Sequence, residues 1–262
     1  MRRKGVFTFL LASCLALSAA SLYAAEKAPP SQPQAKAWLK KMSHYLDTLN
    51  RYQVHIETTR EIIYPRGGRL DENAYGDAFV QQHNRLRINL NKPNQSREIY
   101  YNGSTLSVYT PKLNYYGAIP TPPTTSRMLD KVMTEYGISM PLADILRPNF
   151  YGTVAPRIES GIVVGPSLLN GVYCKQLAFR SGDVDWQIWI EDSPTPLPRR
   201  IVIVDRGVKG NPRYMATLTH WNTNPTFESD LFTFTPPAGA QKIQFVKPGQ
   251  APAQRRPFTR KR

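Results

Sequence analysis

The sequence predicts a mainly β protein with a few helices (α+β), built on one large curved antiparallel sheet of about ten strands. Apolar and polar residues alternate with a period of two over most of the chain. This pattern indicates strands with one apolar face that is shielded from water, called the dry face below, and one polar face that is solvated. Asn102-Gly103 lies between two such segments and is a strong hairpin signal. Two other segments repeat their apolar residues at helical spacing instead.

The first residues, 1–24, have the pattern of a secretory signal peptide. Basic residues at 2–4 precede an uncharged apolar run that ends at the small residue Ala24. We expect cleavage after Ala24, export of the protein, and a linker over 25–33. Two alternatives stay open: the apolar run is retained as a membrane anchor, or Cys14 is lipidated and becomes the new N-terminus.

The segment 34–50 is expected to form an amphipathic helix. Trp38, Met42, Leu46 and Leu49 follow one another at intervals of four, four and three residues, so they share one helix face. This face needs an apolar partner, which the strands that follow can provide.

The segments after this helix change to a period of two. Val54 and Ile56 alternate with polar residues, and Leu86, Ile88 and Leu90 do the same. Strands are therefore predicted at 52–56, 79–90, 98–101, 105–109 and 115–119.

The middle of the chain interrupts the strands. A helix with Ser126 as its N-cap is expected to run to Gly137, which suits a helix C-terminus. Pro141 is suited to the first turn of a second, short helix.

Strands then resume without a clear domain boundary, so 34–246 is expected to be one domain. Val184, Trp186, Ile188 and Ile190 lie on one face of a single strand. The predicted strands of this second group are 172–179, 184–191, 200–205, 214–221 and 231–235.

The charge of the chain is concentrated at its ends. The 262 residues carry a net charge of +15, and 247–262 contain no acidic residue and little apolar content, so this tail is expected to be disordered. An anionic membrane surface is the expected partner of its basic residues, and a purely solubilising role is the alternative. Nucleic acid is not expected as a partner of an exported protein. The residues assigned to the membrane surface are Arg255, Arg256, Arg260, Lys261 and Arg262.

Catalytic and metal-binding patterns are absent from the sequence. The four histidines lie far apart, and neither a nucleophile elbow nor a phosphate-binding loop is present. Asp183 and Asp185 are expected at a solvated strand edge instead of a metal site. Cys174 is expected to be a small buried thiol instead of a nucleophile. No cofactor is expected. The missing motifs alone do not exclude an enzyme, because catalytic groups meet in space and not in sequence; the expectation of no enzymatic activity comes with the carrier hypothesis below.

Several stretches carry a resemblance to known bacterial families. The stretch 102–114 resembles the D/N-G-x-x-L-x-x-Y-x-P-x-x-N hairpin of lipoprotein carriers, and 232–240 resembles their closing F-x-F-x-P-P-x-G segment. The stretches 171–180, 183–191 and 196–199 resemble the predicted periplasmic family called domain of unknown function 2092. This family is similar in fold to the LolA/LolB carriers. The resemblance implies a periplasmic half-barrel of antiparallel strands whose concave mouth is closed by helices.

Strand and helix periodicity predicts which residues would line a cavity in such a half-barrel. The dry face of the strands is large, whereas the helices offer few apolar residues to cover it. A closed core without a cavity is the alternative. The candidate ligand-binding residues are Trp38, Met42, Val54, Ile56, Leu86, Ile88, Leu90, Leu106, Val108, Met128, Met133, Trp186, Ile188 and Ile190.

The resulting hypothesis is a periplasmic, non-enzymatic carrier or binding protein for an acyl chain, a lipid or a lipoprotein. A second hypothesis is a lipid-sensing or envelope-assembly factor that binds an inner- or outer-membrane protein. A hydrolase acting on envelope material is the third.

Overall fold

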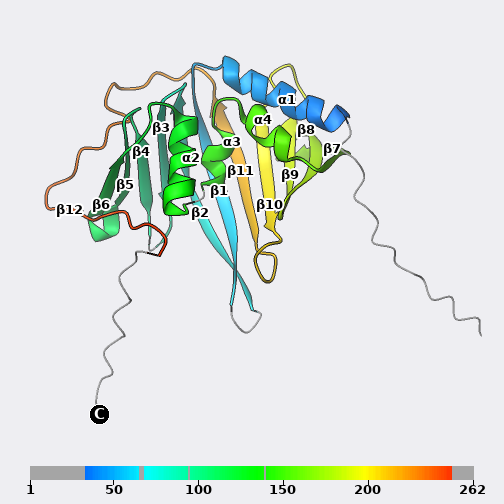
Figure 1. Cartoon of the computed structure of the whole chain (residues 1–262). Coiled ribbons are helices and arrows are strands. Elements are labelled where there is room, and N and C mark those ends of the chain that lie inside the picture. The colour runs from blue at the N-terminus through cyan, green and yellow to red at the C-terminus, as the bar shows by residue number, and fades with distance from the viewer. Residues whose placement is uncertain (1–32, 65–67, 94, 139, 250–262) are drawn as a thin grey trace, which may run out of the picture.

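One curved sheet with helices on its concave side forms the protein (Figure 1). The computed structural model describes residues 33–64, 68–93, 95–138 and 140–249. The described sheet has twelve strands in the order β12-β6-β5-β4-β3-β2-β1-β11-β10-β9-β8-β7. This confirms the predicted fold class, with twelve strands instead of about ten. The strands are β1 (Arg51–Ile63), β2 (Arg69–Gln81), β3 (Arg85–Asn91), β4 (Arg97–Tyr101), β5 (Thr105–Thr110), β6 (Tyr115–Pro120), β7 (Ser160–Leu169), β8 (Val172–Ser181), β9 (Val184–Glu191), β10 (Pro198–Asp205), β11 (Arg213–Asn222) and β12 (Gln241–Lys242).

Two meanders of consecutive strands make up this sheet. Strands β1 to β6 follow one another in space as in sequence, and β7 to β11 do the same. The last strand of the second meander, β11, pairs antiparallel with β1 and joins the two meanders in the middle of the sheet. Helices fill the connection between the two meanders and therefore lie over the sheet they connect (Figure 1).

The register of the strands builds one apolar face. Ile56 in β1 lies opposite Gly76 in β2 and Leu218 in β11. In the second meander, Ile188 in β9 lies opposite Ile201 in β10. Since side chains at every second position share a face, the apolar positions of neighbouring strands form continuous rows on the concave side.

The helix α1 (Pro33–Thr48) covers one end of the concave face. Its apolar stripe buries Leu39, Met42 and Leu46, and it contacts β7, β9 and the short helix α4 (Phe150–Val154). This confirms the helix expected near 34–50. In Figure 1 it lies across the top of the sheet, away from the hairpin between β1 and β2.

Two further helices cover the other part of the concave face: α2 (Thr125–Tyr136) and α3 (Pro141–Ile145). The side chain of Thr124 accepts a hydrogen bond from a backbone N–H of the first turn of α2, so Thr124 is the N-cap. Ser126, the predicted cap, lies inside the helix. Gly137 ends α2 as predicted, with a φ of 64° that favours glycine.

The C-terminal strap, residues 223–249, wraps around the β6 edge of the sheet. The ring of Phe234 lies 5.2–5.3 Å from three tyrosine rings of β4, β5 and β6 on the convex face. The chain then pairs as β12 with β6, and Phe245 reaches Tyr136 of α2, with 5.6 Å between ring centroids. Lys247, which was expected in the disordered tail, forms an ion pair with Glu135 at 3.2 Å.

Several predicted strands need correction. The segment 231–235 is not a strand, because its phenylalanines pack onto the convex face instead of pairing with a neighbour. The predicted strand 79–90 is divided between β2 and β3 by a turn. Strand β2 was missed over most of its length because its concave positions, among them Glu72, Ala74 and Gly76, are polar or small. Strands β7 and β12 and helix α4 were not predicted.

Candidate functional site

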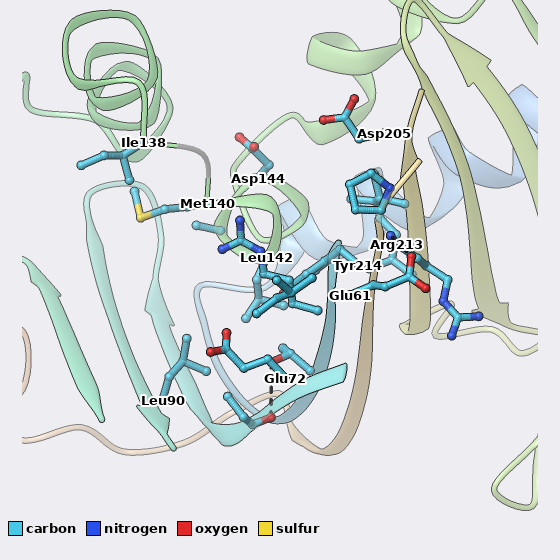
Figure 2. A pocket seen from close by; sticks show the side chains of 18 of the residues that line it. Glu61, Glu72, Leu90, Ile138, Met140, Leu142, Asp144, Asp205, Arg213 and Tyr214 are labelled. Carbon is cyan, nitrogen blue, oxygen red and sulfur yellow. Dashed lines mark hydrogen bonds between the residues drawn. The ribbon is translucent and has the colours of Figure 1, made fainter. Parts of the chain in front are cut away.

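An apolar cavity of about 1590 Å³ lies between the concave face and the helices, and it is open to solvent. It lies at the end of the sheet that α1 does not cover, next to the β1–β2 hairpin. Figure 2 shows Leu90 on its floor, with Ile138 and Met140 on the opposite side. The cavity is the candidate functional site because it is large and mostly apolar.

Strands from both meanders form the floor of the cavity. In β3, β4 and β5 the concave residues alternate with residues of the convex face, so their side chains point into the cavity together. The strand residues that form the apolar floor are Ile88, Leu90, Ile99, Leu106, Val108, Trp186, Ile201, Ile203 and Tyr214.

The roof consists of short elements and loops. Val132 comes from α2, Leu142 and Ile145 from α3, and Phe150 from α4, while Met140 lies in the connection between α2 and α3. Methionine adapts its shape readily, which suits a surface that must fit flexible apolar chains.

The aromatic side of the cavity is held rigidly around Trp186. Its ring stacks on Phe179 with 4.4 Å between centroids and lies edge-on to Phe150. Its Nε1–H donates a hydrogen bond to the Oγ of Ser181 at 3.1 Å, so the indole has no unpaired donor in the apolar wall. These contacts fix the orientation of the Trp186 ring in the wall of the cavity.

A buried cation joins two helices of the roof. Arg147 is 6% exposed, and its guanidinium lies 2.9 Å from an oxygen of Asp130 in α2 and 3.4 Å from an oxygen of Asp144 in α3. It also donates to the backbone oxygen of Ser126. Burial raises the pKa of Asp144, which lines the cavity, and the charge of Arg147 opposes this shift.

The opening of the cavity carries charged side chains at the ends of the strands that form its floor. Lys92 Nζ lies 2.5 Å from Glu72 Oε2, and the hydrogen bond from Lys92 holds the pKa of Glu72 below its ordinary value. Arg60 and Arg97 lower this pKa further through their charges. In the neighbouring part of the opening, Glu61 of β1 accepts a hydrogen bond from Arg69 of β2 at 2.7 Å.

The structure places the predicted ligand-binding residues in three different settings. Five of them line the cavity: Ile88, Leu90, Leu106, Val108 and Trp186. Seven others are at most 2% exposed within closed packing and do not line it: Met42, Val54, Ile56, Leu86, Met128, Ile188 and Ile190.

The remaining two residues, Trp38 and Met133, do not line the cavity either. Trp38 is half-buried, with Lys41 Nζ 5.0 Å from its ring centroid. Met133 is 45% exposed. The residues predicted to contact a membrane surface, Arg255 to Arg262, and the predicted signal peptide, 1–24, lie outside the described residues.

Sequence periodicity missed the charged residues and the loop residues of the cavity. Arg60 continues the period-two row of Val54 and Ile56 at the end of β1, so extending that row past its apolar part would have found it. Phe245 had no such signal, because the strap brings it from the far end of the chain.

A metal site, a reactive cysteine and a membrane span, which the sequence could also have suggested, receive little support from the described part of the chain. Within it, no group of three or more His, Cys, Asp or Glu side chains is placed to hold a metal ion. Asp185 pairs with Arg180 at 2.8 Å, and Cys174 is buried, which raises the pKa of its thiol. Over the same residues, no helix is long and apolar enough to cross a membrane.

Comparison with protein families supports the resemblance noted in the sequence. Residues 35–246 match the model of a family described as "Predicted periplasmic protein (DUF2092)". The chain belongs to this family. The DUF2092 family is described as periplasmic, in agreement with the expected export, and the periplasm is therefore the compartment of the protein. Comparison with curated proteins found no match.

Solved structures share the fold of this DUF2092 protein at low sequence identity. An uncharacterized conserved protein from Thermus thermophilus is 14% identical, with a TM-score of 0.50 over 80% of this chain and 99% of that one. The Mycobacterium tuberculosis lipoprotein LppX is 12% identical, with a TM-score of 0.45 over 75% and 99%. A LolA superfamily protein from Nitrosomonas europaea is 14% identical, with a TM-score of 0.40 over 76% and 97%. The first of these likenesses, at a TM-score of 0.50, concerns the fold alone, and nothing further is concluded from the other two.

Proposed function

We propose that this protein is a non-enzymatic periplasmic carrier or binding protein for an acyl chain, a lipid or a lipoprotein. The observation that carries the proposal is the cavity of about 1590 Å³ with its apolar floor and apolar roof. Such a space strongly favours an apolar occupant over water, because transfer of apolar surface out of water is favourable.

The free energy available from this cavity is sufficient for useful affinity. Burial of about ten methylene groups contributes about 8 kcal/mol, which corresponds to a micromolar dissociation constant before the cost of ordering the chain. A cargo with one or two long chains is therefore bound tightly enough to be carried. Its release requires a partner or a membrane that competes for the apolar surface, and we include such a partner in the proposal.

The direct test is native mass spectrometry of the protein purified from its own envelope, followed by extraction of bound lipid. We expect a bound species with acyl chains, and we expect the purified protein to bind an apolar dye. A protein that retains no lipid and binds neither dye nor long-chain fatty acid contradicts the carrier function.

A matched pair of variants tests whether the cavity is the binding site. Val108→Trp places a larger side chain on the cavity floor and is expected to weaken dye binding about tenfold or more, because it removes space for the dye. Val202→Trp makes the same change on β10, between Ile201 and Ile203, which line the cavity, and therefore on the opposite face. Dye binding by the second variant is expected to match the wild type.

A further inference from the structure

Three basic side chains lie together where the apolar floor of the cavity reaches the opening. The register of the sheet places Arg60 of β1 opposite Glu72 of β2, and Leu90 of β3 opposite Arg97 of β4. Arg60 and Arg97 lie on the concave face, since each is two residues from a residue of the cavity lining, Thr58 and Ile99. Both are exposed to solvent at the opening.

Among the described residues, Glu72 is the one carboxylate that accompanies these cations. Lys92 forms its ion pair with Glu72 at 2.5 Å, so this pair is neutral. Within the described residues, neither Arg60 nor Arg97 has a carboxylate oxygen within 4 Å. The local charge of the cluster formed by Arg60, Glu72, Lys92 and Arg97 is therefore +2, and two guanidinium groups are available to an incoming anion.

The part of the opening next to β11 differs in charge. There Glu61 of β1 accepts hydrogen bonds from Arg69 of β2 at 2.7 Å and from the backbone N–H of Arg213 at 3.2 Å, and Asp205, Lys209 and Arg213 also line the cavity. Acidic and basic groups are mixed in this part, so it offers an anion less attraction. The excess positive charge is concentrated around Arg60, Lys92 and Arg97.

Apolar surface begins immediately behind the cations. Leu90 lies directly opposite Arg97, and Ile99 follows Arg97 by two residues on the same face. A molecule whose apolar chain lies on this floor would bring a polar end group to the arginines. A guanidinium matches the oxygens of a phosphate or a carboxylate in two parallel hydrogen bonds.

We propose that the cavity selects an anionic lipid, and that Arg60, Lys92 and Arg97 bind the phosphate or carboxylate of its headgroup. This inference rests on the proposed function, because it assumes that the acyl chain occupies the cavity. It adds the class of cargo: one negatively charged group at the end of the chain, rather than a neutral or cationic one. Glu72 holds Lys92 in place and weakens the attraction of the cluster for anions.

The test uses displacement of an apolar dye from the mature full-length protein by three probes. These are hexadecyl phosphate, hexadecanol with the same chain, and inorganic phosphate. We expect hexadecyl phosphate to bind about tenfold or more tightly than hexadecanol, as expected for hydrogen bonds to a charged group. Inorganic phosphate, which has no chain, is expected not to displace the dye.

Variants assign this preference to the cluster. Arg60→Gln combined with Arg97→Gln is expected to remove the preference, so that hexadecyl phosphate binds no more tightly than hexadecanol. The matched control is Arg51→Gln combined with Arg85→Gln, which removes two positive charges from the opposite face of the sheet and is expected to keep the preference. Glu72→Gln is expected to strengthen hexadecyl phosphate binding, so the proposal can be tested even where the double variant folds poorly.

The outcomes separate this inference from the function on which it rests. Equal affinity for hexadecyl phosphate and hexadecanol in the wild type overturns the headgroup site but leaves the carrier function intact. A preference that survives in the double variant also overturns it. Binding of inorganic phosphate to the same arginines with equal strength, measured by calorimetry, shows that a soluble anion is the ligand and overturns the lipid assignment. Failure of every chain-bearing probe contradicts the carrier function itself.

Discussion

The two ends of the concave face have the same strand pattern but opposite packing. At the α1 end, Val54, Ile56 and Ile188 are fully buried in a closed core. At the other end, Leu90 and Val108 continue the same alternation but line an open cavity. The difference lies in the helices above them. Alternation of apolar residues therefore creates the dry face, and the length and position of the covering helices decide whether that face becomes core or binding site.

The covering helices explain why one end closes and the other stays open. Helix α1 has 16 residues and buries five of them, including Leu39 and Met42. Helices α3 and α4 have only 5 residues each, and of the 12 residues of α2 only Val132 lines the cavity. A single helical turn covers little apolar surface, so the volume beneath it stays unfilled.

The largest expected effect comes from placing a charge at each end. Ile188→Asp buries a carboxylate in closed packing and is expected to destabilise the protein by more than about 4 kcal/mol or to prevent folding. Val108→Asp places the same group in the open cavity, where water reaches it, and is expected to leave a folded protein that no longer binds apolar dye. Circular dichroism and dye titration measure both effects. Equal unfolding of both variants would show that the second end is also closed core.

Alanine substitutions in the segments that cover the sheet are expected to distinguish the two ends of the concave face less strongly. Leu39→Ala in α1 removes a fully buried side chain and is expected to cost about 3 kcal/mol of unfolding free energy. Ile138→Ala removes a side chain that is 39% exposed above the cavity, so its cost is expected to stay near about 0.5 kcal/mol. The dye affinity should change in the reverse order, with the larger loss in Ile138→Ala. Denaturant unfolding and dye titration of both variants test this reversal.

The cation that joins α2 and α3 is expected to have a moderate effect. Arg147→Met keeps the apolar stem but removes the hydrogen bonds to Asp130, Asp144 and Ser126, for an expected cost of about 2 kcal/mol. The cost stays moderate because both carboxylates are partly exposed and remain hydrated in the variant. Lys131→Met, which breaks an exposed ion pair within α2, is the control and should cost no more than about 0.5 kcal/mol. Dye binding that is unaffected by Arg147→Met would show that the roof does not depend on this contact.

The smallest expected effects are the contributions of two aspartates to the pH dependence of folding stability. The hydrogen bond from Arg180 lowers the pKa of Asp185, so its ionised form stabilises the folded state. This contribution is present above the ordinary pKa of 3.8 and is lost as the pH falls through the folded-state value. Asp185→Asn should therefore reduce the loss of stability in acid.

Asp144 at the cavity end should show the opposite sign. Burial raises the pKa of Asp144 above its ordinary value of 3.8, so protonation favours the folded state. That gain begins as the pH falls through the raised value and is complete below 3.8. Asp144→Asn removes the gain and should steepen the loss of stability in acid. The free energy of unfolding of both variants and the wild type is measured from neutral pH down to below the ordinary aspartate pKa. An equal dependence of this free energy on pH in both variants would contradict the predicted difference in sign.

The sequence was sufficient to predict the class of fold and the dry face. Period-two alternation identified the concave residues of β3, β5 and β9, and the helical spacing of Trp38, Met42 and Leu46 identified α1. These features depend on neighbours within a few residues, which share a face for geometric reasons alone. The family resemblance was likewise carried by local stretches and was confirmed over 35–246.

Only the tertiary structure decided which part of the dry face is a cavity. Ile188 and Trp186 lie on the same face of β9, but the first lies in the closed core and the second lines the cavity, next to Phe150 of α4. The cluster around Glu72 is also a tertiary feature, since its residues come from β1, β2, β4 and the residue that follows β3, and they meet only through the register. Periodicity along a chain determines the direction of a side chain, whereas the partner that covers it comes from distant segments whose position depends on the whole fold.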